Sequence, residues 1–195
     1  SDRIKSVVCL GRTAPPMEHH KVHFIHTTFD NLINHQHLFS GVQRVYCCLG
    51  TTIKKAGSQK AFKKVDYDYV VDLAQLAHQA GVPHFSVISA IGADRNAKIF
   101  YSKVKGEMEN ALIQTNFKRL SIYQPGLLQG NRTEWRFGEM AGNVLVSAFK
   151  FLIPFKYRGI ACERVAKAML LNSFKNDEGV EFLTNKDMEV MAKCL

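Results

Sequence analysis

The sequence of 195 residues lacks the features of membrane-spanning, disulfide-stabilised and disordered proteins. It contains no run of about 18 apolar residues, so no transmembrane helix is predicted. The five cysteines do not have the paired spacing of a disulfide framework, and they indicate reduced thiols. With 46% hydrophobic and 22% charged residues, the chain has enough apolar surface to form a folded core.

No signal peptide is visible at the N-terminus, which starts polar and enters an apolar strand pattern within about five positions. Reduced thiols are typical of a reducing compartment. Together these two observations predict a cytoplasmic location.

Patterns typical of metal sites are also missing. Cys47 and Cys48 are adjacent in a strand-like run, so their side chains point to opposite faces of the strand. A metal site needs three or four converging ligands with supporting partners. Several histidines crowd one stretch without such spacing, and we predict no metal site there: His19, His20, His23, His26, His35 and His37.

The charge is the one unusual feature of the composition. Lys and Arg exceed Asp and Glu by enough to give a formal net charge of +9. A basic surface attracts nucleic acids, anionic lipids or phosphorylated small molecules. No zinc-finger, helix-turn-helix or RNP signature accompanies the charge, and aromatic residues do not alternate with the lysines. We therefore expect no nucleic-acid partner, and a nucleic-acid binder stays only as a third class supported by charge alone.

The hydrophobic pattern predicts the fold class. Short apolar runs predict strands at 6–10, 22–26, 44–49, 84–89 and 119–123, with a short last strand at 181–183. Helical spacing predicts helices at 31–40, 69–81, 101–116, 142–151, 160–173 and 186–193. Apolar strands that alternate with helices are typical of an α/β fold with a doubly wound parallel sheet. No linker divides the chain, so residues 1–195 are predicted to form a single domain.

Ligands of such sheets bind beyond the carboxyl ends of the strands. Glycines at these ends let the backbone approach a ligand closely, although most glycines at strand ends only form turns. The residues at these ends are Gly11, Arg12, Thr13, Asp30, Gly50, Thr51, Thr52, Ser89, Pro125 and Gly126.

Ser89, Tyr101 and Lys105 form the strongest combination of candidate catalytic residues. Ser89 ends a predicted strand, and Tyr101 and Lys105 are four residues apart on one face of the next predicted helix. A tyrosine exchanges a proton at a carbonyl or alcohol, a nearby lysine lowers its pKa, and a serine holds the substrate oxygen. A Tyr-x-x-x-Lys pair alone is usually structural, and the serine at a strand end makes the pattern more specific.

With these motifs the sequence resembles the atypical short-chain dehydrogenase/reductases, close to the NmrA-like and Tat-interacting-protein-like NAD(P)-binding proteins. The resemblance extends from residue 5 to about residue 190. The motifs that carry it are Val45–Thr52, Ser89–Asp94, Tyr101–Glu107 and Gln124–Gly126.

The resemblance implies an NAD(P)-binding Rossmann fold with the substrate side at about residues 126–195. It places Gly11 and Arg12 at the adenosine ribose, and Arg12 favours NADP over NAD because a guanidinium matches a 2′-phosphate. It places Asp30 near the adenine and Lys105 at the nicotinamide ribose. The remaining residues that it assigns to the cofactor are Leu49, Gly50, Thr51, Thr52, Pro125 and Gly126.

Two departures from the family pattern stand out. The family's first strand and its Gly-x-x-Gly-x-x-Gly loop, which binds the pyrophosphate, are absent from the sequence. Strand order 3-2-1-4-5-6 puts that strand in the middle of the sheet, so its absence predicts a gap between strands 6–10 and 44–49. We therefore expect the sequence to begin after the true start. The second departure is Ala90, where relatives often carry another serine.

Besides the nucleic-acid binder, the site residues and the resemblance support two classes of function. The first is an NAD(P)-dependent oxidoreductase that acts on a small carbonyl compound or alcohol. The alternative is an NAD(P)-binding regulatory or redox-sensing protein without turnover, because a fold does not fix a function. Trp135, between Arg132 and Arg136, either lines the substrate cleft or caps the core. The sequence predicts neither a particular substrate nor an oligomeric state.

Overall fold

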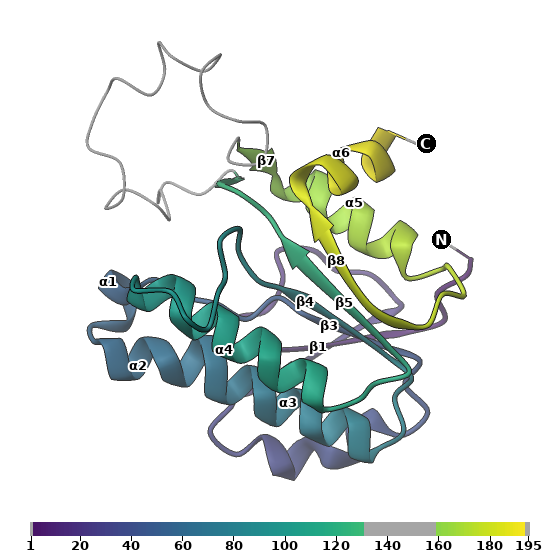
Figure 1. The fold of residues 1–195 in the computed structure, drawn as a ribbon. Coiled ribbons are helices and arrows are strands. Elements are labelled where there is room, and N and C mark those ends of the chain that lie inside the picture. Colours follow the sequence, from purple (N-terminus) through teal and green to yellow (C-terminus); the bar gives the residue numbers. More distant parts are fainter. Residues whose placement is uncertain (1, 131–158, 194–195) are drawn as a thin grey trace.

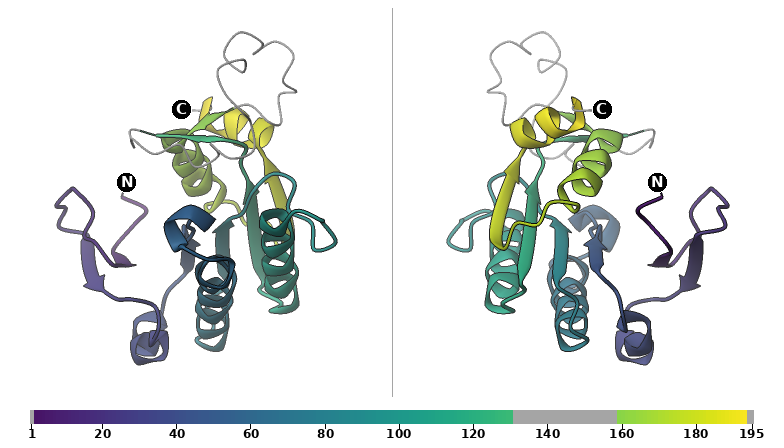
Figure 2. Two further views of the ribbon diagram at one scale, coloured as in Figure 1. Left: turned by 90° about the vertical axis from the view of Figure 1, so that its left-hand side faces the viewer. Right: turned by 90° about the vertical axis from the view of Figure 1, so that its right-hand side faces the viewer.

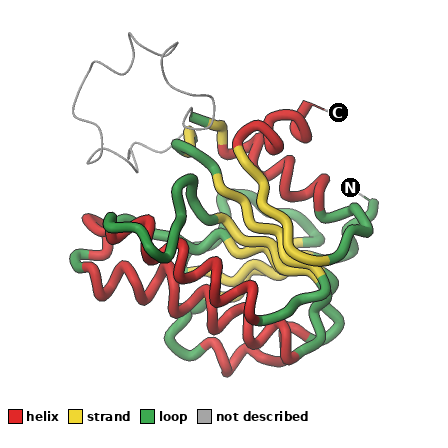
Figure 3. The backbone as a smooth tube through the Cα atoms, viewed as in Figure 1, coloured by secondary structure: helices red, strands yellow, loops and turns green. Residues whose placement is uncertain are grey.

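The computed structural model describes residues 2–130 and 159–193, in which helices alternate with strands (Figures 1 and 3). The strands are β1 (Val7–Gly11), β2 (Val22–His26), β3 (Arg44–Cys47), β4 (His84–Ile88), β5 (Arg119–Gln124), β6 (Leu128–Gln129), β7 (Ile160–Ala161) and β8 (Gly179–Thr184). The helices are η1 (Leu32–Phe39), α1 (Ile53–Ala56), α2 (Gln59–Lys63), η2 (Lys64–Asp68), α3 (Tyr69–Gln79), α4 (Phe100–Gln114), α5 (Cys162–Asn172) and α6 (Asn185–Lys193).

The strands pair in parallel throughout the described residues. The main sheet has the order β3-β4-β5-β8, and two smaller sheets are formed by β1-β2 and β6-β7. The predicted α/β fold with parallel strands is therefore confirmed, and all six predicted strands fall within one or two residues of observed ones. The helix predicted at 142–151, like Trp135, lies outside the described residues.

Two apolar cores cover the two faces of the main sheet. On one face, Phe85 and Val87 of β4 pack with Leu120 and Ile122 of β5 against α3 and α4. On the other face, a second core packs α5 and α6 against β5 and β8. Because side chains alternate along a strand, β4 and β5 are buried on both faces, with apolar side chains on the first face and a mixture of apolar and polar ones on the second.

The β1–β2 pair stands apart from the main sheet (Figure 2). Within the described chain, β1 pairs only with β2, and β3 pairs only with β4. Val7 and Val8 of β1 are 38% and 43% exposed, and Tyr46 of β3 is 39% exposed. β1 is thus less covered than the strands of the main sheet.

The segment from Gln59 to Gln79 is helical throughout and contains one π turn, η2, between α2 and α3. Ser58 begins it, because its hydroxyl accepts a hydrogen bond from the Ala61 amide at 3.1 Å. A π turn adds one residue to a helical turn and occurs frequently at functional sites. Here it places Asp66, which is 1% exposed, at the centre of the turn.

Candidate functional site

Helix α4 presents three candidate side chains at successive fourth positions: Tyr101, Lys105 and Glu109. This spacing puts them on one face of the helix, as the sequence predicts for the first two. Lys105 is 4% and Glu109 6% exposed, whereas Tyr101 is half-buried and its ring packs at 5.6 Å from that of Phe62. The helix therefore carries polar groups into a largely apolar interior.

The buried Lys105 is paired with an acidic residue that the sequence analysis did not identify. Its Nζ lies 2.8 Å from Oδ1 of Asp66, in the π turn η2. The other carboxylate oxygen, Oδ2, accepts a hydrogen bond of 2.8 Å from the backbone N–H of Thr51. Asp66 therefore joins the lysine of α4 to the loop that follows β3. The only sequence signal for it is the general rule that a buried lysine needs an anionic partner.

Ser89 directly follows β4 and is 4% exposed. Its backbone N–H donates to the carbonyl of Tyr123 at 2.7 Å, which fixes the residue at the end of β4. Its Oγ makes no hydrogen bond with the described residues. A buried hydroxyl without a partner is costly, and a substrate oxygen would satisfy it.

Glu109 lies close to Ser89, outside ordinary hydrogen-bond geometry. Burial raises the pKa of Glu109, and the neighbouring Ser89 hydroxyl and Gln124 amide offset part of the rise. Gln124 Nε2 lies 3.0 and 3.1 Å from the two carboxylate oxygens. Glu109 is thus a second buried acidic group next to the candidate catalytic residues.

The loop after β3 holds four of the predicted cofactor residues: Leu49, Gly50, Thr51 and Thr52. All four are partly buried. Thr52 caps the short helix α1, since its Oγ1 accepts a hydrogen bond of 3.0 Å from the Lys55 amide. The Thr52 hydroxyl and the Thr51 amide are therefore already engaged.

Pro125 and Gly126, also predicted at the cofactor, are buried after β5. The Pro125 carbonyl accepts a hydrogen bond of 3.0 Å from the Ile91 amide, in the loop that follows Ser89. The Gly126 amide donates to Oδ1 of Asn185 at 2.9 Å. The structure thus joins these residues to the segment that carries Ser89.

The other predicted cofactor residues lie on the separate β1–β2 unit. Gly11 ends β1, and Arg12 follows it as an exposed side chain. Asp30 follows β2, and its Oδ1 accepts hydrogen bonds from Lys64 at 2.5 Å and Tyr69 at 2.7 Å. Hydrogen bonds from Lys64 and then Tyr69 lower the pKa of Asp30. The carboxylate that the resemblance places near the adenine therefore already has two partners.

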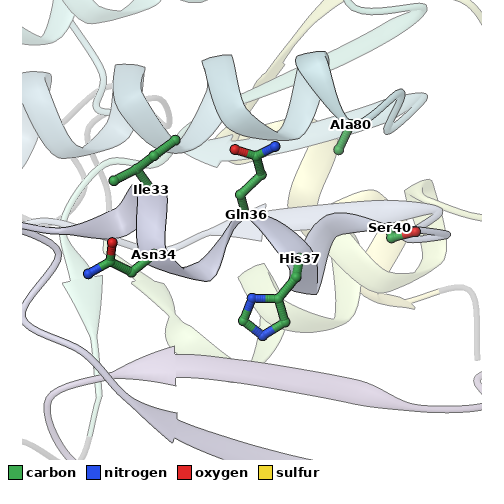
Figure 4. A pocket seen from close by; sticks show the side chains of 6 residues that line it. All are labelled: Ile33, Asn34, Gln36, His37, Ser40 and Ala80. Carbon is green, nitrogen blue, oxygen red and sulfur yellow. The ribbon is translucent and has the colours of Figure 1, made fainter.

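A pocket of about 470 Å³ lies between η1 and the end of α3 (Figure 4). Ile33 and Gln36 point toward α3, whereas His37 points away from it. None of the candidate catalytic residues lines this pocket. Within residues 2–130 and 159–193 no group of His, Cys, Asp or Glu side chains could hold a metal ion. The helices of the same ranges include none that is long and apolar enough to cross a membrane.

A buried polar network covers part of the opposite face of the main sheet, beneath α5. Oε1 of Glu181 accepts hydrogen bonds from Arg119 Nη2 at 2.7 Å, Ser121 Oγ at 2.6 Å and Asn172 Nδ2 at 2.8 Å. His84 Nε2 lies 2.8 Å from Ser121 Oγ. Burial, and then the positive charge of Arg119, lowers the pKa of His84 to about 4. His84 is therefore neutral at pH 7.

Comparison with known proteins gives relatives along most of the chain. No family model matches. The chain is 37% identical over 162 residues to protein HTATIP2 of Rattus norvegicus, a match that covers 81% of this chain and 65% of the relative. It is 30% identical over 154 residues to protein FMP52 of Saccharomyces cerevisiae, covering 75% of the chain and 66% of the relative. The chain thus spans slightly less than two thirds of the length of these relatives.

The names of the FMP52 relatives describe them as mitochondrial. This finding contradicts the predicted cytoplasmic location. Among the described cysteines, Cys9, Cys47, Cys48 and Cys162 are free thiols. Free thiols do not distinguish one cellular compartment from another, so the cysteines do not support a cytoplasmic location.

Solved structures share the fold. MoeE5, solved in complex with UDP-glucose and NAD, superposes with a TM-score of 0.69 at 12% identity, over 98% of this chain and 74% of MoeE5. The oxidoreductase ylbE of Lactococcus lactis superposes with a TM-score of 0.52 at 23% identity, over 64% of this chain and 59% of ylbE. The chain is thus a sequence relative of HTATIP2 and FMP52, and it has the NAD-binding Rossmann fold that the resemblance to the atypical short-chain dehydrogenase/reductases implies.

Proposed function

We propose that this protein is an NAD(P)-dependent oxidoreductase that acts on a small carbonyl compound or alcohol. The observation that carries the proposal is the buried Ser89 Oγ, which has no partner among the described residues and lies beside helix α4. Tyr101 and Lys105 lie on that face of the same helix. A hydroxyl left open beside a helix whose same face carries a tyrosine and a lysine fits a carbonyl oxygen that is bound and protonated.

Each residue has a distinct role in this proposal. Ser89 donates a hydrogen bond to the substrate oxygen and orients it. Tyr101 donates the phenolic proton to that oxygen as the substrate is reduced. Lys105 stabilises the phenolate that remains, because a cation favours a nearby anion. A bound nicotinamide dinucleotide supplies the hydride.

The described residues fit the nicotinamide end of a dinucleotide better than its pyrophosphate. A lysine ammonium has three N–H donors, so Lys105 retains two donors for ribose hydroxyls after pairing with Asp66. Pro125 and Gly126 follow the neighbouring strand β5. No glycine-rich strand–loop–helix unit for a pyrophosphate occurs in the described ranges.

The decisive test of catalysis is Tyr101→Phe. Positioned acid catalysis contributes about 10²–10⁴-fold, so we expect turnover to fall by that factor while dinucleotide affinity stays nearly unchanged. Tyr67→Phe is the matched control, since Tyr67 lies on η2 and packs against Lys63. Full reductase activity of Tyr101→Phe on an identified substrate would refute the assignment.

Arg12 tests the proposed preference for NADPH. Its exposed side chain follows β1, where a guanidinium could form charge-assisted hydrogen bonds to a 2′-phosphate. We expect Arg12→Ala to weaken NADPH binding by about 10–100-fold and to leave NADH binding unchanged. Fluorescence titration measures both affinities, and Arg164→Ala on α5 is the control. Equal affinities for the two dinucleotides in the unmodified chain would contradict the preference.

One observation favours the alternative of a dinucleotide-binding protein without turnover. Asp66 already neutralises Lys105, which weakens the effect of the lysine charge on a neighbouring phenol. In that case the chain binds NADPH or NADH, and Tyr101→Phe changes neither binding nor any measurable reduction. Titration combined with a screen of small aldehydes and ketones separates the two functions.

A further inference from the structure

The ion pair between Asp66 and Lys105 is nearly inaccessible to solvent. The side chains of the two residues are 1% and 4% exposed, and Oδ1 lies 2.8 Å from Nζ. An isolated buried charge is strongly unfavourable, so each member of such a pair depends on the other. A contact of this kind fixes the positions of both side chains.

The second oxygen of Asp66 extends the contact to a separate segment. Oδ2 accepts a hydrogen bond of 2.8 Å from the backbone N–H of Thr51. The loop also approaches the carboxylate closely at the preceding residue, where a Cβ on Gly50 would lie 3.4 Å from Oδ1. One carboxylate thus bridges the loop after β3 and the buried lysine of α4.

The π turn explains why Asp66 can make both contacts. Asp66 lies in the middle of η2 (Lys64–Asp68), and η2 packs against α4. The extra residue of a π turn rotates the following side chains by about 100° relative to a regular α-helix. Phe62, one turn earlier, packs against the Tyr101 ring, so this helical segment also contacts α4 one turn before Lys105.

We propose that Asp66 is a positioning residue that couples the Gly50–Thr52 loop to Lys105. The backbone that lines the dinucleotide and the ammonium that holds its ribose then keep one fixed arrangement before any ligand binds. The purpose of this coupling rests on the proposed function. The coupling itself is a property of the ligand-free chain, so it can be tested separately.

The first test measures amide hydrogen exchange of the full chain without ligand, in the peptide that covers residues 49–53. We expect Asp66→Asn to speed exchange at Thr51 by about tenfold or more, since a neutral amide oxygen replaces the charged acceptor and the ion pair that positions it is lost. Lys105 does not bond to the loop in the structure. Coupling therefore predicts that Lys105→Met also speeds exchange at Thr51, because an unpaired Asp66 no longer keeps its position.

The double variant Asp66→Asn/Lys105→Met removes both charges, so it stays folded even if a single variant does not. Coupling predicts that its exchange at Thr51 is no faster than that of the single variants. Unchanged protection of residues 70–79 in α3 confirms that the fold is intact. Glu178→Gln, which breaks the exposed Lys118–Glu178 pair at 2.9 Å, is the control and leaves Thr51 unaffected. Slow exchange at Thr51 in a folded Lys105→Met chain overturns the coupling.

The second test separates positioning from a purely structural role. Asp66→Asn leaves the buried Lys105 without its counter-charge, which disfavours the charged ammonium and its fixed position, so the lysine stabilises a Tyr101 phenolate less. The alkaline limit of the reductase kcat/KM then moves to higher pH by about one unit or more. The other carboxylate that interacts with Lys105, that of Glu109, is unchanged in this variant. An alkaline limit that does not move refutes the positioning role of Asp66. If the original chain binds no dinucleotide, the proposed function is refuted, but the hydrogen-exchange result still tests the coupling.

Discussion

Gly106 is the position in α4 where we expect the smallest possible side chain to have the largest effect. It lies one residue after Lys105, on the part of the helix that packs against the loop following β4. A Cβ built on Gly106 would lie 2.2 Å from the backbone N of Arg95 and from the backbone C of Asp94. Ordinary contact begins near 3.4 Å, so the variant Gly106→Ala must push this backbone away by about 1 Å.

The expected loss of stability combines two opposing effects. Overpacking against rigid backbone costs about 3 kcal/mol at the upper end of its usual range. Alanine is the better helix former by about 1 kcal/mol, which offsets part of this cost. We therefore expect Gly106→Ala to lower the free energy of unfolding by about 2 kcal/mol. The displaced loop continues from Ser89, so turnover should fall by about 10²-fold, the effect of a 1 Å misplacement.

Urea unfolding followed by circular dichroism measures the change in stability. Gly11→Ala is the control for adding a methyl group where there is room for it, because a Cβ there would meet nothing nearer than 3.6 Å. If Gly106→Ala is as stable as the original chain and as active, the close approach between α4 and residues 94–95 does not exist in solution.

Two further predictions concern the polar network beneath α5. The folded-state pKa of His84, about 4, lies below its unfolded value of 6.5, so its contribution of about 3 kcal/mol is complete above pH 6.5 and is lost as the pH falls to 4. Urea unfolding between pH 4 and pH 7 should show this loss in the original chain and not in His84→Gln. Burial raises the pKa of Glu181, but hydrogen bonds from Ser121, Arg119 and Asn172 outweigh it and lower the pKa overall. Glu181→Gln leaves the buried Arg119 without its counter-charge, so we expect thermal unfolding at pH 7 to show a loss of about 3 kcal/mol, and an unchanged melting temperature would contradict this.

The strands and long helices could be predicted because burial imposes a period on the sequence. The prediction at 22–26 coincides with β2, and Phe100–Gln114 closely matches the predicted helix 101–116. The short helices α1 and α2 were missed because four or five residues show no recognisable apolar stripe. The positions of Ser89, Tyr101 and Lys105 followed from local spacing, and their proposed roles stay predictions.

Contacts between distant segments could not be predicted in the same way. Asp66 meets Lys105 across 39 positions only because a π turn and the packing of α4 bring them together. Likewise, Asp30 was predicted near an adenine, and the structure adds Lys64 and Tyr69 as its partners. Polar pairing across a fold depends on tertiary geometry, which a single sequence does not encode in any short pattern.

The separation of β1 from β3 has a consequence for handling this chain in solution. Each strand has one free edge among the described residues, and such an edge is a template for pairing with another molecule. Natural sheets protect their edges with charges or prolines, but β1 reads Val-Val-Cys-Leu-Gly and carries neither. Arg44 gives β3 a single charge at its start. At high concentration we therefore expect the chain to self-associate, with the free edge of β1 or β3 pairing with a strand of another molecule. Val8→Lys places a charge on the exposed part of β1 and should reduce this association.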